Sequence, residues 1–130
     1  MAEFRKEERR KLRRLVLVEP LRARTGATPV LIYDLSARGA RIVHATHIAR
    51  VGETLMLLIN WQDLEIMLNC EVRRTAIKVT DGDSPRQVYE SGLMIVFAEE
   101  PSIKALDVLM EGEGRKAQIR KAISIATPPQ

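Results

Sequence analysis

Short apolar runs separated by turn residues dominate the chain between about residues 15 and 98. The runs are rich in Val, Ile and Leu, and they span residues 15–24, 28–36, 39–45, 53–60, 65–79 and 87–98. Turn-forming Gly, Pro, Asp and Ser residues lie between them, most densely in the polar stretch 81–85. Short β-branched runs at this spacing predict about six strands of a small all-β sandwich or barrel.

Two of the predicted strands carry residues that qualify this pattern. Pro20 removes a backbone hydrogen-bond donor from the first run, which predicts an edge position or a β-bulge there. In the fifth run, charged residues at 71 and 73 alternate with Val72, as expected for a strand with at least one solvated face. We therefore expect Arg73 and Arg74 to be solvent-facing strand residues.

A helical pattern replaces the strand pattern after residue 99. Pro101 suits the first turn of a helix, and Ile103, Leu106 and neighbouring apolar residues follow at helical spacing. This predicts a helix that covers the barrel. Gly112 and Gly114 are expected to interrupt it, and residues 115–125 could form a second helix.

These patterns predict a simple division of the chain. Residues 1–14 form a basic N-terminal arm, residues 15–112 a barrel with its covering helix, and residues 113–130 a basic C-terminal extension. A chain of 130 residues with 45% hydrophobic content suits one such domain.

The positive charge is concentrated at the N-terminal end. Residues 1–24 contain nine Lys or Arg and four Glu, a net charge of +5, although the whole chain carries only +4. The arm is therefore expected to bind an anion. Nucleic acid is disfavoured as that anion, because the remaining residues have a net charge of −1 and aromatic residues make up only 4% of the chain.

Few residues suggest catalytic or metal chemistry. Cys70 is the single cysteine and has no histidine or acidic partner nearby in the sequence, so we expect a buried structural thiol. His44 and His47 lack the carboxylate or thiol spacing of a metal site. Trp61 is expected to anchor a turn or an end of the barrel. The sequence thus predicts no enzyme, metal or cofactor.

The segment 1–14 contains no apolar stretch typical of a secretory signal, and no apolar run approaches the length of a membrane-spanning helix. We expect a cytoplasmic protein without membrane insertion.

Two motifs follow one another at the start of the predicted barrel. The first is Arg10-x-x-x-Arg14, and the second is the turn Asp34-x-Ser36-x-x-Gly39. Either motif alone is weak evidence, because paired arginines and permissive turns are common. Together, in this order and spacing, they resemble the paired motifs of the PilZ domain family. The later run Gly92-Leu93-x-x-x-Phe97 and the final helix also follow the family's order, so that the resemblance covers roughly residues 8–112.

This resemblance implies a six-stranded antiparallel β-barrel with a C-terminal helix, and cyclic di-GMP as the ligand. Arginine suits such a ligand, because its planar guanidinium can bind phosphate oxygens or a guanine edge and can stack on a base. Asp34 would accept hydrogen bonds from guanine N1 and N2, Ser36 would cap the turn, and Gly39 would allow a backbone conformation or a close approach of the ligand that a side chain prevents.

Other arginines surround the two motifs. Arg9-x-x-x-Arg13 also fits the first motif, although Arg10 and Arg14 are favoured because Arg14 then lies immediately before the first strand. Arg9 and Arg13 are otherwise expected to attract the anionic ligand through long-range charge. Arg38 and Arg41 are given a secondary role beside Gly39.

The resemblance also suggests a signalling role. Ligand binding would order the basic arm, and this ordering would be relayed to a downstream protein partner, with a homodimer also possible. The alternative is a PilZ-like interaction module that docks to a partner independently of nucleotide.

Overall fold

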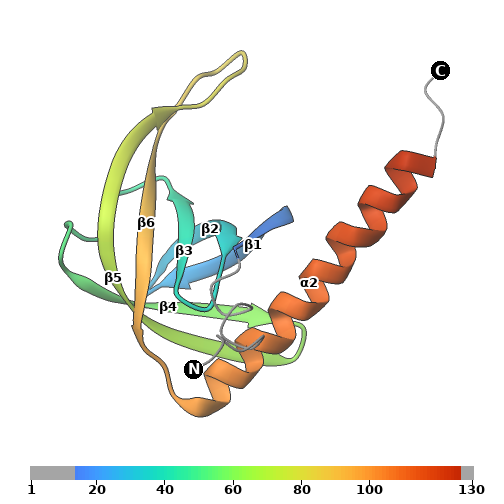
Figure 1. Ribbon diagram of the computed structural model, residues 1–130. Coiled ribbons are helices and arrows are strands. Elements are labelled where there is room, and N and C mark those ends of the chain that lie inside the picture. The colour runs from blue at the N-terminus through green and yellow to red at the C-terminus, as the bar shows by residue number, and fades with distance from the viewer. Residues whose placement is uncertain (1–13, 127–130) are drawn as a thin grey trace, which may run out of the picture.

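The computed structural model describes residues 14–126 as six strands and one long helix (Figure 1). The strands are β1 (Leu15–Thr25), β2 (Thr28–Leu35), β3 (Gly39–His44), β4 (Thr54–Trp61), β5 (Leu64–Val79) and β6 (Gln87–Phe97), and the helix is α2 (Glu100–Ala126). The six strands that the apolar runs predict are all present.

The strands close into a barrel in the order β1-β2-β3-β6-β5-β4, and every neighbouring pair is antiparallel. The β1–β2 register shifts between Val16 and Leu21, and this interval contains Pro20. The irregularity expected from the missing N–H of Pro20 is therefore confirmed.

Aliphatic side chains fill the barrel. Those with 0% exposure include Ile32, Ile42, Leu57, Ile59, Ile66, Leu68 and Val72, which come from four of the six strands. Alternating positions on each strand supply these side chains, as the period of two along a strand requires. The core holds the strand ends in fixed positions, including the β2–β3 turn at the barrel surface.

The β5–β6 hairpin extends well beyond the rest of the barrel (Figure 1). Its strands pair from Asn69↔Phe97 to Val79↔Gln87, and a loop at residues 80–86 joins them. Register shifts occur next to Cys70 and between Val72 and Arg74. The second shift changes the direction of the side chains near residue 73.

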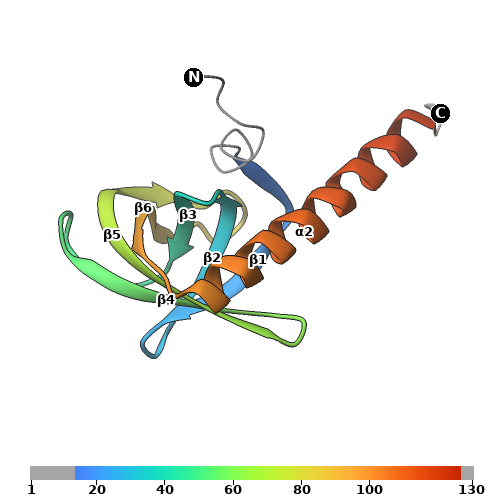
Figure 2. The ribbon, with the colours of Figure 1, turned by 60° about the horizontal axis from the view of Figure 1, so that its bottom comes forward.

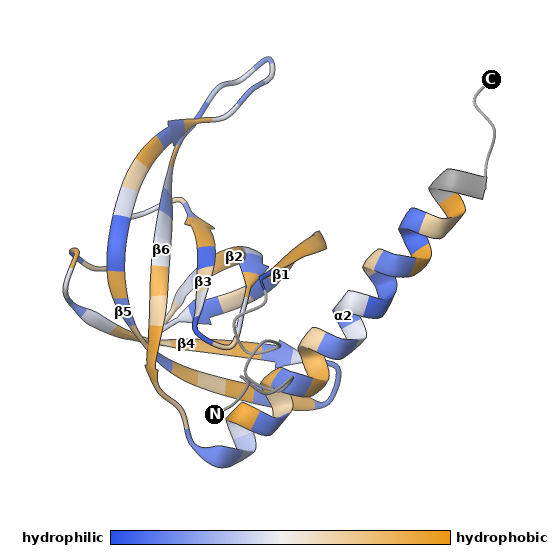
Figure 3. Ribbon diagram, in the orientation of Figure 1, coloured by the Kyte–Doolittle hydropathy of each residue, from blue (hydrophilic) through white to orange (hydrophobic). Residues whose placement is uncertain are grey.

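The helix α2 packs against β5 and β1 and then projects away from the barrel (Figures 1 and 2). Leu106 and Leu109 are buried on its barrel side, and the hydroxyl oxygen of Ser102 accepts a 3.0 Å hydrogen bond from the backbone N–H of Met67 in β5. Beyond residue 114 its basic residues alternate with Ala and Ile, and no acidic residue is present (Figure 3).

The prediction that Gly112 and Gly114 interrupt the helix was wrong, because α2 is continuous from residue 100 to residue 126. Gly112 lies against the indole of Trp61, where an added Cβ would be 2.7 Å from Cη2. Trp61 ends β4 and donates a 3.0 Å hydrogen bond from Nε1 to the buried carboxylate of Glu113. Trp61 is thus the predicted barrel-end anchor. It contacts both Gly112 and Glu113, the residues on either side of the domain boundary expected between positions 112 and 113.

In residues 14–126, no helix is long and apolar enough to cross a membrane.

Candidate functional site

The turn between β2 and β3 is closed by Ser36. Its backbone N–H donates to the carbonyl oxygen of Gly39 at 2.8 Å. Its hydroxyl oxygen accepts hydrogen bonds from the backbone N–H groups of Arg38 and Gly39, both at 3.1 Å. Ser36 therefore caps the turn as predicted, and the turn is held by its own hydrogen bonds.

Gly39 allows two strands to approach closely. An added Cβ would overlap the backbone carbonyl oxygen of Leu93 on β6, the strand paired with β3. Its φ is not positive, unlike the φ values of the glycines Gly26, Gly52 and Gly82. The structure thus gives Gly39 a role that was not expected, the close approach of a neighbouring strand, while close approach of the ligand stays a prediction.

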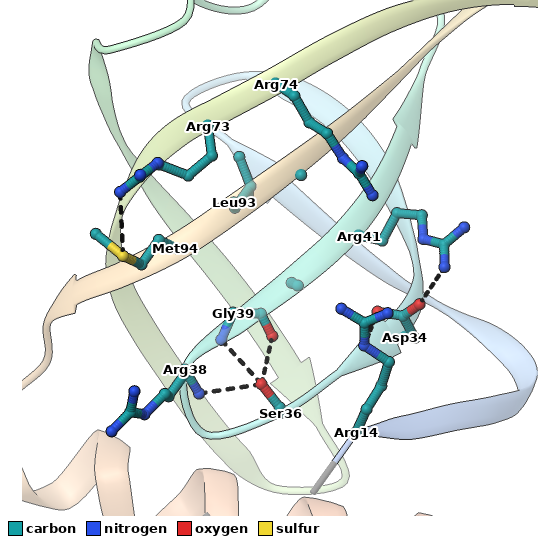
Figure 4. Close-up of a pocket in the computed structure, with 12 residues that line it drawn as sticks. Arg14, Asp34, Ser36, Arg38, Gly39, Arg41, Arg73, Arg74, Leu93 and Met94 are labelled. Atoms are coloured by element: carbon teal, nitrogen blue, oxygen red, sulfur yellow. Dashed lines mark hydrogen bonds and ion pairs between the residues drawn. The ribbon is translucent and has the colours of Figure 1, made fainter. Parts of the chain in front are cut away.

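Asp34 lies at the end of β2 with only 5% of its surface exposed. It is opposite Arg41 in the β2–β3 register, and Arg41 Nη2 lies 2.9 Å from Asp34 Oδ2. Arg14 Nε approaches the other carboxylate oxygen at 3.8 Å (Figure 4). Two arginines from different segments therefore converge on one nearly buried carboxylate, which offsets the cost of burying its charge.

A surface pocket of about 420 Å³ opens beside this carboxylate. Its lining comes from β2, β3, β5, β6 and the residue before β1, and consists of Arg14, Asp34, Ser36, Arg38, Gly39, Ala40, Arg41, Arg73, Arg74, Gly92, Leu93 and Met94. Five of these side chains are arginines and one is a carboxylate, so the lining has a strong positive excess.

The expectation that Arg73 and Arg74 are ordinary solvated strand residues was incomplete. Both are exposed, but both line the pocket (Figure 4). Two adjacent strand residues normally point to opposite faces, and the register shift between Val72 and Arg74 breaks that alternation. No signal in the sequence marks this shift.

The site residues predicted from the sequence divide into two groups. Arg14, Asp34, Ser36, Arg38, Gly39 and Arg41 all line the one pocket. Arg9, Arg10 and Arg13 lie outside the described residues, so the choice between the two arginine registers stays a prediction. Arg14 lies immediately before β1, as the favoured register expects.

A second polar cluster lies on the same strands, outside the pocket lining. His44 Nε2 lies 2.8 Å from the hydroxyl of Ser91, whose oxygen is 3.0 Å from the hydroxyl of Thr75. His44 Nδ1 is 2.7 Å from the carbonyl oxygen of Thr46, and the imidazole stacks on Tyr89. Burial lowers the pKa of His44 from its ordinary value of 6.5. Ser91 is only 1% exposed, which closes this histidine–serine pair to a substrate.

Cys70 is fully buried, and burial raises the pKa of its thiol to about 12. The prediction that Cys70 is buried is confirmed, and a thiol with so little thiolate is a poor nucleophile. Across residues 14–126, no group of three or more His, Cys, Asp or Glu side chains could hold a metal ion.

Comparison with solved structures identifies the fold. The chain is similar to the PilZ domain with c-di-GMP of YcgR from Escherichia coli, with a TM-score of 0.71 and 15% sequence identity, and the alignment covers 88% of this chain and 98% of that chain. No protein-family model and no curated protein sequence matches this chain. The predicted fold, a six-stranded PilZ-like barrel with a C-terminal helix, is confirmed.

Proposed function

We propose that this chain is a cyclic di-GMP receptor without enzymatic activity, and that it binds the dinucleotide in the pocket beside Asp34. The observation that carries the proposal is the convergence of Arg14, Asp34, Ser36 and Gly39 on one pocket. These four residues come from two separate motifs, and the barrel that unites them is similar to a PilZ domain with c-di-GMP.

The charge and geometry of the pocket suit this ligand. Each molecule of cyclic di-GMP has two phosphodiester groups, and the lining arginines offer planar guanidinium donors for their oxygens. Asp34 keeps unused acceptor positions beside its contacts with Arg14 and Arg41. These positions suit the N1 and N2 donors of guanine, and adenine lacks that donor edge.

Calorimetric titration of the full chain with cyclic di-GMP, cyclic di-AMP and GTP tests the proposal. We expect saturable binding of cyclic di-GMP only, with at least tenfold weaker binding in Arg14→Ala and Asp34→Ala, because each removes a charged partner of the ligand. Arg24→Ala is the matched control, since Arg24 is an exposed strand arginine outside the pocket lining. Absence of cyclic di-GMP binding, or equal binding of cyclic di-AMP, would overturn the proposal.

The arm 1–14 supplies the remaining arginines and the proposed signal. Ligand phosphates would offset the mutual repulsion of its positive charges and order it against the barrel. Amide hydrogen exchange should slow in residues 5–14 on addition of cyclic di-GMP. Unchanged exchange at saturating ligand would refute arm ordering, while Arg9→Ala and Arg10→Ala titrations decide which arginine register binds.

The projecting part of α2 is the surface we propose for a downstream protein partner. Residues 115–123 contain four basic and no acidic residues, and Ile119 and Ile123 are each 60% exposed. Exposed apolar side chains within a basic helix suit an acidic partner. A chain ending at Gly114 should keep cyclic di-GMP affinity and lose capture of that partner. Ligand-independent capture by the full chain would favour the alternative of a docking module that acts without nucleotide.

A further inference from the structure

One wall of the pocket contains a row of three residues on neighbouring strands. Gly92 of β6 is the register partner of Arg41 on β3 and of Arg74 on β5. The row therefore reads arginine, glycine, arginine across the sheet, and all three residues line the pocket. Arg74 extends from β5 across β6 toward Arg41 (Figure 4).

The missing side chain of Gly92 makes room for Arg74. A Cβ added to Gly92 would be 3.2 Å from both Cγ and Nε of Arg74, which is tighter than ordinary van der Waals contact. The φ of Gly92 is not among the positive values, so backbone conformation does not require glycine here. The glycine instead lets the arginine lie flat against the sheet.

Arg74 also differs from its neighbours in its partners. Arg14 and Arg41 contact Asp34, and Arg73 contacts Glu71 at 3.9 Å. Among the ion pairs of residues 14–126, none involves Arg74. A guanidinium without a carboxylate partner, spread over a bare stretch of strand, keeps its flat face and its charge available to a ligand.

We infer that Arg74 is a ligand-binding residue and that its guanidinium stacks on a guanine base of the cyclic dinucleotide. The missing side chain of Gly92 leaves the space in which Arg74 lies against the sheet. A planar cation stacks well on an extended π-system, which is why arginine is common under nucleobases. The pocket would then bind a guanine base from two sides. The turn at Asp34 would recognise the edge of the base, and Arg74 would bind its face. This inference rests on the proposed function and extends it to a residue outside both motifs.

Calorimetric titration with cyclic di-GMP tests the role of Arg74. Arg74→Gln should weaken binding about tenfold, and Arg74→Lys should recover little, because lysine keeps the charge but has no flat face. Arg24→Gln, at an exposed strand position outside the pocket, should bind like the wild type. Wild-type affinity in Arg74→Gln, or full recovery in Arg74→Lys, would overturn the stacking role.

A double-mutant cycle tests the role of Gly92. Gly92→Ala should weaken binding in the wild-type background and have little further effect in Arg74→Gln, because its methyl group acts by displacing Arg74. Equal losses in both backgrounds would overturn this link, and thermal unfolding of each variant checks that it folds.

The outcomes separate this inference from the proposed function. If the wild type binds and Arg14→Ala loses binding while Arg74→Gln does not, only the inference about Arg74 fails. If the wild type does not bind cyclic di-GMP, both the proposed function and the inference about Arg74 fail.

Discussion

Two glycines in the same helix should respond in opposite ways to replacement by alanine. An added Cβ at Gly112 would lie 2.7 Å from Cη2 and 2.8 Å from Cζ2 of Trp61, whereas nothing lies within 4 Å of the same atom at Gly114. Trp61 has little freedom to move, because it is 8% exposed and its Nε1 is bound to Glu113. The extra methyl group therefore has no space at Gly112 and free space at Gly114.

The expected magnitudes follow from two opposing effects. Alanine is favoured over glycine in a helix interior by about 1 kcal/mol, and this gain applies at both positions. Overpacking a rigid contact costs about 1–3 kcal/mol, and this cost applies only at Gly112. Gly114→Ala should thus raise the free energy of unfolding by about 1 kcal/mol. The free energy of unfolding of Gly112→Ala should be lower than that of Gly114→Ala by about 1–3 kcal/mol.

Urea unfolding measures both changes. Trp61 is the only tryptophan, so its fluorescence reports directly on the contact between α2 and the barrel, and circular dichroism follows the whole fold. Equal stabilisation by Gly112→Ala and Gly114→Ala would refute the reasoning, because it would mean that α2 does not press on Trp61.

Three further predictions concern the site and the adjoining strands. Ser36→Ala should lower the free energy of unfolding by about 1 kcal/mol in urea titration, since two backbone N–H groups of the turn lose their acceptor. Gly39→Ala should abolish cyclic di-GMP binding and lower the melting temperature, because its Cβ would overlap the carbonyl oxygen of Leu93 and separate β3 from β6; an unchanged melting temperature would contradict this. Burial lowers the pKa of His44, so the unfolded chain binds the proton more tightly than the folded chain does. The stabilisation by the neutral imidazole should therefore be complete above pH 6.5 and be lost as the pH falls toward the lowered pKa of the folded chain. Urea unfolding between about pH 8 and about pH 5 measures that loss, which His44→Gln should reduce.

Much of the fold could be predicted because the barrel follows local rules. Strands filled on one face by aliphatic residues leave a period of two in the sequence, and turn residues mark their ends. The irregularity at Pro20 was predictable for the same reason, since a missing N–H is a property of one residue. The turn at Ser36 was predictable because its hydrogen bonds are made within four residues.

The features that escaped prediction depend on contacts between distant segments. Gly112 has a low helix propensity, but packing against Trp61 outweighs it and α2 continues. Arg74 joins the pocket because of the register shift in β5 and the bare backbone of Gly92, which is 18 positions away in the sequence and directly opposite in the sheet. Such pairings arise only when the barrel closes.

The strand β6 links ligand binding to the closure of the barrel through three consecutive residues. Ser91 is bound to the buried His44, Gly92 forms the floor beneath Arg74, and Leu93 receives the close approach of Gly39. Any substitution that weakens the pairing of β6 should therefore alter the pocket as well as the stability. Conversely, a ligand that binds only the folded chain must stabilise it by an amount set by its concentration and affinity. Losses of binding at Ser91 and Leu93 should scale with losses of stability, whereas a loss at Arg74, or at Gly92 through Arg74, should leave the stability of the ligand-free chain unchanged.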